Sequence, residues 1–197
     1  MARPREFEES DVIASAMEVF WRKGYQGTSV ADLVEATGLQ RGSLYGAFGD
    51  KHSLYLTALD AYTSDALAAF ARLRSAHDDP VDGVRAFIRM LGEDCKNGTG
   101  SERSCMVVGA CSELAADDLA ARQRVQAFLT DMQGAIGAAL AAGQERGSFS
   151  ADRDPVAVGV FIQSSLQGLN VLAQSKPGDA AIDSVIAELL GTLDFSP

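Results

Sequence analysis

The 197-residue sequence predicts an all-α protein, and three observations carry this prediction. Apolar residues recur at three- and four-residue spacing through nearly the whole chain, which places side chains on one face of a helix. No run of alternating polar and apolar residues bounded by hairpin signals is present, although a half-buried strand would need one. With 47% apolar and 22% charged residues, the chain can bury a core. We therefore expect a globular helical protein of one domain or two small ones.

Two helices are expected at the N-terminal end. The first follows Ser10 as its cap and stops at Gly24. Its buried stripe consists of Ile13, Ala16, Met17 and Phe20. The second covers residues 29–37, because Ser29 supplies a cap and Asp32 follows three residues later as a weak capping box.

The second helix and a third over residues 40–48 have the spacing of a helix-turn-helix. A Thr-Gly-Leu turn joins them, and its Gly38 accepts the left-handed backbone of a tight turn. The third helix would then present one side outward and can enter a DNA major groove. It contains Gly42 and Gly46, each less favourable in a helix than Ala by about 1 kcal/mol. Two glycines would only weaken a helix that serves as a scaffold, whereas they suit a helix whose backbone approaches DNA closely. The alternative is that the three helices form an ordinary packing corner without DNA contact.

The polar side chains around the third helix suit contacts with DNA. Arg41 can pair with guanine O6 and N7, and Gln40 can pair with adenine. Ser43, Tyr45 and Lys51 suit phosphate oxygens. The motif therefore predicts base readout by two residues and positioning on the backbone by three.

The rest of the chain is expected to form further helices. Two of them start at Asp-Pro pairs, with Pro80 and Pro155 at the first helical position, where a proline's missing N–H costs nothing. The expected helices cover residues 50–75, 80–95, 105–111, 117–143, 155–175 and 180–193. The third of these, residues 105–111, is apolar on all sides and is expected to be buried around its circumference. We expect two domains, residues 1–52 with the helix-turn-helix and residues 53–197 as a larger helical domain.

The charge of the chain does not by itself support binding to nucleic acid. The formal net charge is -10, of which -2 falls in residues 1–52 and -8 in the remainder. Neither part is basic, so a DNA-binding role has to rest on the motif.

Cysteine and histidine content limits the other functions. Three cysteines form no CxxC pair, and their odd number fits a reducing compartment. The N-terminus lacks a signal-peptide core and the longest apolar stretches are too short to span a bilayer, so we expect a cytoplasmic protein without membrane contact. His52 and His77 lack metal-ligand spacing, and no P-loop, GxGxxG or GxSxG motif occurs. We expect no enzyme, no cofactor and no metal site.

The N-terminal region resembles a known family. The resemblance to the TetR family of bacterial transcription regulators is carried by residues 16–29 (AMEVFWRKGYQGTS) and 33–54 (LVEATGLQRGSLYGAFGDKHSL). It implies a homodimer whose N-terminal domains bind a palindromic operator on double-stranded DNA, and whose C-terminal domain binds a small-molecule inducer and releases the DNA. By position it implies DNA contacts by Ser29, Gln40, Arg41, Gly42, Ser43, Tyr45, Gly46 and Lys51. At Gly46 the family often carries a larger side chain, which puts a base contact there in question.

The C-terminal part resembles one branch of that family in outline, through residues 104–114 (SCMVVGACSEL) and 166–169 (LQGL). Some members of this branch use a cysteine before the central helix to sense electrophiles or oxidants, and Cys105 is the matching residue. Its neighbour Arg103 could lower the thiol pKa, whereas the alternative is that Cys105 is a buried apolar filler. We expect a repressor released by a small apolar ligand. The alternatives are a Cys105-based redox or electrophile sensor and a helical interaction protein without DNA binding.

Two further sets of residues follow from the helical pattern and the family architecture. The ligand is expected to be neutral or cationic, because no basic cluster lines the region, and methionines adapt to irregular ligands. The candidate ligand-binding residues, expected on inward faces, are Met90, Cys105, Met106, Phe128, Met132 and Phe161.

The last two helices carry apolar stripes that are wide enough to form both a core contact and a dimer interface. The alternative is that these helices only close the core of the monomer. The candidate interface residues are Val160, Gly168, Val171, Ile186, Leu189 and Leu190. The helix over residues 50–75 is expected to couple the two domains.

Overall fold

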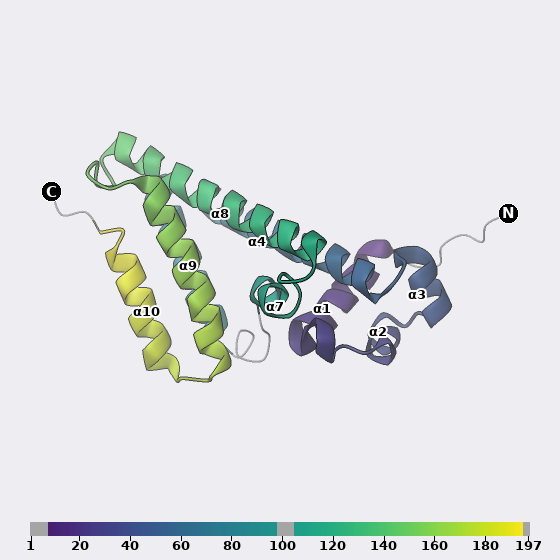
Figure 1. Cartoon of the computed structure of the whole chain (residues 1–197). Helices are drawn as coiled ribbons and strands as arrows, with labels where there is room; N and C mark the ends of the chain where they lie inside the picture. The colour runs from purple at the N-terminus through teal and green to yellow at the C-terminus, as the bar shows by residue number, and fades with distance from the viewer. Residues whose placement is uncertain (1–7, 98–104, 195–197) are drawn as a thin grey trace.

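The computed structural model describes residues 8–97 and 105–194, and within these ranges it contains helices and no strands. The helices are α1 (Glu9–Gly27), α2 (Val30–Thr37), α3 (Arg41–Phe48), α4 (Lys51–Ser75), α5 (Pro80–Lys96), α7 (Met106–Glu113), α8 (Leu119–Arg146), α9 (Pro155–Gln174) and α10 (Asp179–Gly191). The all-α prediction is confirmed. In Figure 1, α1, α2 and α3 form one end of an elongated molecule, and α9 and α10 lie toward the other end.

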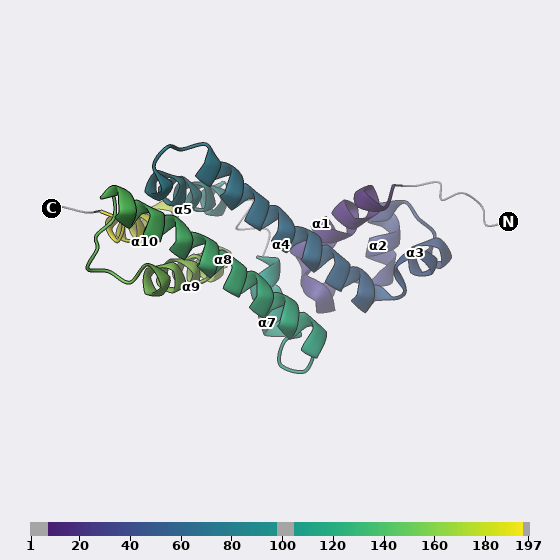
Figure 2. The same ribbon diagram turned by 90° about the horizontal axis from the view of Figure 1, so that it is seen from above.

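Helix α4 connects the small N-terminal unit to the larger helical part. Figure 2 shows α4 running from the side of α1 and α3 into the body of the molecule, where it packs against α5 and α8. It begins at Lys51, so it crosses the domain boundary expected after residue 52. That boundary stays a prediction.

Helix α1 differs in two details from the expected one. It begins at Glu9 with Glu8 at the cap, and the Glu8 side chain makes no capping hydrogen bond, so the prediction that Ser10 is the cap is wrong. Gly24 does interrupt the helix, with φ of 72° and ψ of 175°, but helical backbone resumes and reaches Gly27. Its buried residues are Val12, Ala16 and Phe20, whereas Ile13 and Met17 are only half-buried.

The predicted start of α2 agrees with the structure, whereas α8, expected from residue 117, begins at Leu119 with Asp118 as its cap. Ser29 and Asp32 form a complete capping box, in which each side chain accepts a hydrogen bond from the other residue's backbone N–H. The Lys23 ammonium, 2.6 Å from Asp32, and Ser29 lower the pKa of the Asp32 carboxyl to about 2. Gly38 has φ of 67° and ends α2 as expected.

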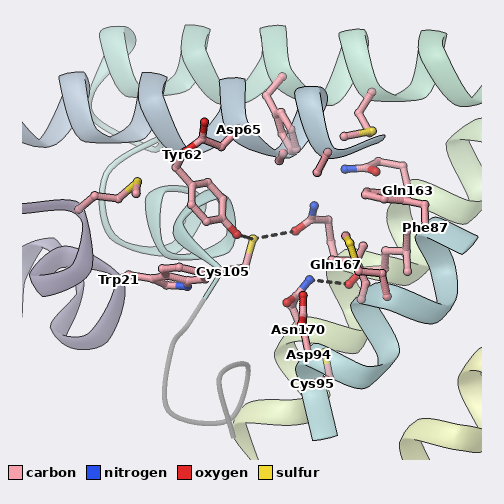
Figure 3. Close-up of a pocket in the computed structure, with 18 residues that line it drawn as sticks. Trp21, Tyr62, Asp65, Phe87, Asp94, Cys95, Cys105, Gln163, Gln167 and Asn170 are labelled. Carbon is pink, nitrogen blue, oxygen red and sulfur yellow. Dashed lines mark hydrogen bonds between the residues drawn. The ribbon is translucent and has the colours of Figure 1, made fainter. Parts of the chain in front are cut away.

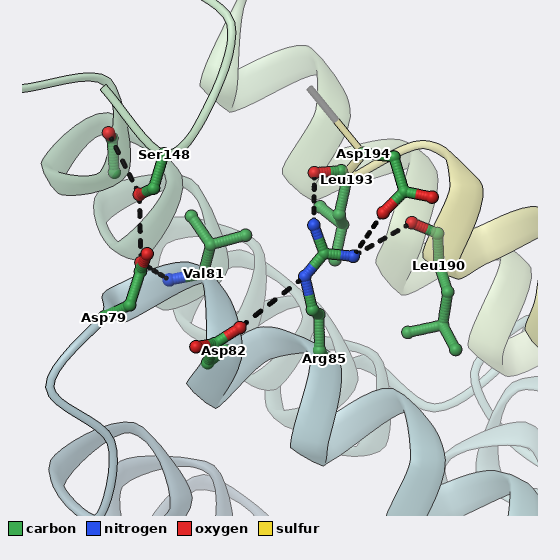
Figure 4. A network of polar contacts seen from close by, with 9 residues as sticks. Asp79, Val81, Asp82, Arg85, Ser148, Leu190, Leu193 and Asp194 are labelled. Carbon is green, nitrogen blue, oxygen red and sulfur yellow. Dashed lines mark hydrogen bonds and ion pairs between the residues drawn. The ribbon is translucent and has the colours of Figure 1, made fainter. Parts of the chain in front are cut away.

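Side-chain caps begin two of the C-terminal helices, and one arginine connects α5 to α10. The carboxylates of Asp79 and Asp154 cap α5 and α9 in front of their prolines, as predicted. Arg85 on α5 donates hydrogen bonds to the carbonyls of Leu190 and Leu193 and to the carboxylate of Asp194 (Figure 4). This contact fixes the C-terminal end of α10 against α5.

The prediction of an all-round buried helix over residues 105–111 is wrong in part. Helix α7 spans Met106–Glu113, with Cys105 at its N-cap. Met106, Val107 and Ala110 are buried, but Cys111 is exposed, because one side of α7 faces outward.

Candidate DNA-binding surface and ligand cavity

The helix α3 is anchored on one side and exposed on the other. Leu44 is fully buried, while Arg41 and Ser43 are exposed and Tyr45 is half-buried. The Arg41 guanidinium lies 5.7 Å from the centre of the Tyr45 ring. A Cβ added at Gly42 or at Gly46 would meet nothing within 4 Å. Internal packing therefore does not require these glycines, and α3 presents an open backbone surface together with exposed Gln40 at its N-cap.

Two side chains expected at phosphates already have partners within the chain. The Lys51 ammonium donates hydrogen bonds of 2.8 Å to the carbonyls of Tyr25 and Thr28, and it lies 4.3 Å from the centre of the Tyr25 ring. The Ser29 hydroxyl takes part in the capping box of α2. Lys51 thus ties the first turn of α4 to the C-terminal end of α1 and to Thr28 directly after it. A contact of Lys51 with phosphate stays a prediction.

The N-terminal unit is joined to α7 through a carboxylate that the sequence did not reveal. The Glu113 side chain, at the last residue of α7, accepts hydrogen bonds from the backbone N–H groups of Tyr25 (3.3 Å) and Gln26 (2.7 Å). These N–H groups follow the break at Gly24, where a Cβ would lie 2.4 Å from a Glu113 oxygen. Gly24 therefore provides both the broken helix and the room that the carboxylate needs.

A second contact between the two parts joins α4 to α8. His52 is hydrogen-bonded to the carboxylate of Asp118, which also caps α8 by accepting from the Ala121 N–H. The Ala121 N–H and His52 lower the pKa of the Asp118 carboxyl. His52, which showed no metal-ligand spacing, thus makes a structural contact between α4 and the start of α8.

A cavity of about 410 Å³ lies between α1 and the helices of the C-terminal part. Its lining residues are Met17, Trp21, Tyr62, Asp65, Ala66, Ala69, Phe87, Met90, Leu91, Asp94, Cys95, Cys105, Phe128, Met132, Gln163, Leu166, Gln167 and Asn170. Four of the six candidate ligand residues are among them, namely Met90, Cys105, Phe128 and Met132. Met106 is buried but does not line the cavity. Phe161 is 51% exposed, so its expected inward position is wrong; it lies on the outer face of α9.

Polar side chains on α4 and α9 meet Cys105 at the cavity (Figure 3). The Tyr62 hydroxyl donates a hydrogen bond to the Cys105 sulfur at 3.6 Å. The Cys105 thiol in turn donates to the side-chain carbonyl oxygen of Gln167 at 3.5 Å. Burial raises the pKa of the Tyr62 hydroxyl. Cys105 is 6% exposed, and Arg103, expected to act on its thiol, lies outside the described residues. Burial raises the pKa of the Cys95 thiol to about 11.

The candidate dimer residues divide between surface and core. Val160, Gly168 and Val171 are exposed on α9, on the same side as Phe161. On α10, Leu189 is only 2% exposed, so an interface role for this residue is wrong; it packs in the monomer core. Ile186 and Leu190 are half-buried on α10. A Cβ added at Gly92 on α5 would lie 2.8 Å from Ile186, which shows how closely α10 packs there. We call the exposed set Val160, Phe161, Gly168 and Val171 the α9 outer face.

A groove of about 380 Å³ runs beside the α9 outer face, between α7, α8 and α9. Gln163 and Gln167 line both this groove and the cavity, so they form part of the wall between the two spaces. By length and composition α9 is apolar enough to cross a membrane, with a mean hydropathy of 1.5. Its inner face, however, packs into the helical core, where Ile162, Leu166 and Leu169 are buried.

An exposed helix-turn-helix followed by a helical domain with an internal cavity defines a class of DNA-binding regulators. Residues 12–58 match the family model of bacterial regulatory proteins of the tetR family. Residues 80–189 match the model of the tetracyclin repressor-like C-terminal domain. The chain therefore belongs to the TetR family of transcription regulators.

Individual relatives agree with this assignment. The chain is 26% identical over 172 residues to the transcriptional repressor ComR of Escherichia coli K12, covering 87% of this chain and 82% of ComR. It is 26% identical over 196 residues to the regulator TtgR of Pseudomonas putida, covering 95% and 92%. A solved structure of a cysteine mutant of the regulator CifR, complexed with 26 bp of double-strand operator DNA, superposes with a TM-score of 0.83 at 27% identity, covering 96% and 98%.

Proposed function

We propose that this chain is a homodimeric transcriptional repressor that binds a palindromic operator through α3 and leaves it when a small ligand fills the cavity. The observation that carries the proposal is the path of contacts from the cavity to the DNA-binding unit. Cys105, the N-cap of α7, lies in the cavity wall, and Glu113 at the other end of α7 accepts hydrogen bonds from the backbone of α1. In the same way α4 begins beside α3 and passes the cavity at Tyr62.

A ligand can release the DNA only if it binds the released arrangement of the dimer more tightly than the operator-bound arrangement. The coupler expected from the sequence was α4 alone. We infer that α7 is the second coupler, because it is a short helix with its N-cap at the cavity and its last residue on α1. The α9 outer face would pair with its copy in the dimer, and two-fold symmetry is what a palindromic operator requires. We also infer a cytoplasmic location without enzymatic activity.

The first test is binding to the DNA that flanks the gene. We expect the dimer to shift a duplex with an inverted repeat, with an affinity that falls steeply as salt rises, because phosphate contacts release counterions. The measurement is a gel shift or anisotropy titration at several salt concentrations, beside a scrambled duplex. A chain that binds no duplex at low salt would instead be a helical interaction protein.

A redox or electrophile sensor is the second candidate, because Cys105 lies in the cavity wall against Tyr62 and Gln167. Modification would add bulk to a packed site and cost about 1 to 3 kcal/mol. The deciding measurement is operator release by mild oxidants, compared between the wild type and Cys105→Ser, with Cys95→Ser and Cys111→Ser as controls. We expect no release that depends on Cys105; release that disappears only in Cys105→Ser would establish the sensor.

A further inference from the structure

Gln163 is a polar side chain in the buried part of an apolar helix. It is only 3% exposed, although its neighbours on the inner face of α9 are Ile162 and Leu166. It lines the cavity, and Figure 3 shows its amide group extending from α9 into the space that the lining residues surround. A buried amide costs free energy unless it forms hydrogen bonds.

The hydrogen bonds of the other cavity amides show how Gln163 differs. The Gln167 carbonyl oxygen accepts from the Cys105 thiol, and the Asn170 amide donates to the carbonyl of Leu166 at 2.9 Å. In the part of the chain that the structure describes, no group donates to or accepts from the Gln163 amide. Gln163 therefore presents an unused donor and an unused acceptor to whatever fills the cavity.

The remaining lining limits the chemistry of the ligand. Most of it is apolar or aromatic, and the cavity is large enough for a compound of drug-like size. The charged side chains among the described lining residues are the carboxylates of Asp65 and Asp94. These carboxylates repel an anion, and an ionised group on the ligand would lose its hydration in the apolar part of the cavity.

We propose that Gln163 is the polar anchor of the ligand cavity and that the ligand is an uncharged, largely aromatic molecule with one oxygen that accepts a hydrogen bond from the Gln163 amide. The inference rests on the proposed function, because it specifies the ligand of the same cavity. The same residue would also transmit ligand binding from the cavity toward the α9 outer face. Gln163 forms part of the wall between the cavity and the groove beside that face.

The test uses three matched probes and the full-length protein. Benzophenone carries one carbonyl between two rings, diphenylmethane has the same rings without the oxygen, and 4-benzoylbenzoate adds a negative charge. Binding is measured by isothermal titration calorimetry and, for benzophenone, by quenching of Trp21, which is the single tryptophan of the chain and lines the cavity.

We expect the wild type to bind benzophenone about tenfold more tightly than diphenylmethane, since one hydrogen bond to a buried amide is involved. The carboxylate probe should bind at least about tenfold more weakly than benzophenone. Gln163→Leu should bind both neutral probes equally well. Gln126→Leu, which changes an exposed glutamine of α8 outside the cavity lining, should keep the wild-type preference.

Three results would overturn the proposal: equal affinity of the wild type for the two neutral probes, a preference that survives in Gln163→Leu, or no binding of benzophenone up to its solubility. Tighter binding of 4-benzoylbenzoate than of benzophenone would overturn the assignment of an uncharged ligand. The comparison of probes in the wild type does not depend on the folding of any variant. Operator binding without probes is measured separately, so a failure of the proposed function is distinguishable from a failure of this inference.

Discussion

Arg41 and Lys51 are two basic residues of the same small unit with different surroundings. Arg41 is exposed on α3, and its guanidinium lies over the ring of Tyr45 on the same helix. Lys51 is half-buried and donates to the backbone carbonyls of Tyr25 near the end of α1 and of Thr28 directly after it. The Arg41 side chain is therefore available to contact a base edge. The Lys51 side chain instead holds the N-terminal unit together, near the position where a phosphate contact is expected.

Replacing each of these residues should have a distinct effect on operator binding. Arg41→Ala is expected to cost about 1 to 3 kcal/mol and to relax base preference at one position of each half-site. Lys51→Ala is expected to weaken binding to all sequences and to flatten the salt dependence. The measurement is a titration against operators with single base changes. Loss of affinity in Arg41→Ala without a change of base preference would contradict the assignment of Arg41 to base readout.

At the scale of elements, the contact between α7 and α1 was invisible in the sequence. The pattern of α7 predicted only a buried helix, whereas its last residue, Glu113, reaches the N–H groups of Tyr25 and Gln26. These partners are more than eighty positions away along the chain. The N–H groups need an acceptor because the break at Gly24 removes their partners within the helix.

Removing the Glu113 carboxylate should loosen this connection. Glu113→Ala is expected to speed the hydrogen exchange of the Tyr25 and Gln26 amides about tenfold, because each loses a charge-assisted hydrogen bond. Native-state hydrogen exchange followed by NMR measures this directly. Glu145→Ala, at an exposed position near the end of α8, is the matched control and should leave both amides unchanged. Unchanged exchange in Glu113→Ala would show that α7 does not hold α1.

For the whole molecule, the α9 outer face is an apolar surface that the described part of the monomer leaves exposed. Val160, Phe161 and Val171 are 41%, 51% and 54% exposed, and Gly168 lies among them with open space above it. Large apolar side chains gathered on one helix face indicate a surface that a partner covers. The proposed partner is the same face of a second copy.

A charge on this face should separate the two copies. Phe161→Glu is expected to give monomers at micromolar concentration and to reduce operator affinity at least tenfold, because one half-site then binds alone. The midpoint of thermal unfolding also becomes independent of concentration. Sedimentation velocity measures the oligomeric state. Leu119→Glu, at an equally exposed apolar residue on the first turn of α8, should remain dimeric; a Phe161→Glu variant that also stays dimeric would contradict the interface.

The sequence by itself determined which segments are helical, the caps of α2, α5 and α9, and the DNA-binding motif. These features depend on neighbours a few residues apart, such as Ser29 with Asp32 or the aspartates that precede Pro80 and Pro155. A period of 3.6 residues likewise identifies an apolar stripe without reference to the rest of the fold. Four of the six candidate cavity residues, which the helical pattern suggested together with the family architecture, do line the cavity.

Only the tertiary structure decided which apolar face meets which neighbour. Phe161 and Leu189 are both apolar residues on two-faced helices, yet the first points outward and the second into the core. The sequence cannot distinguish them, because the direction of a face depends on how whole helices pack against one another. The same holds for Gln163, whose position in an apolar stretch becomes meaningful only when its amide is found at the wall of a cavity. Function here depends on contacts between distant segments, and periodicity within one segment carries no information about them.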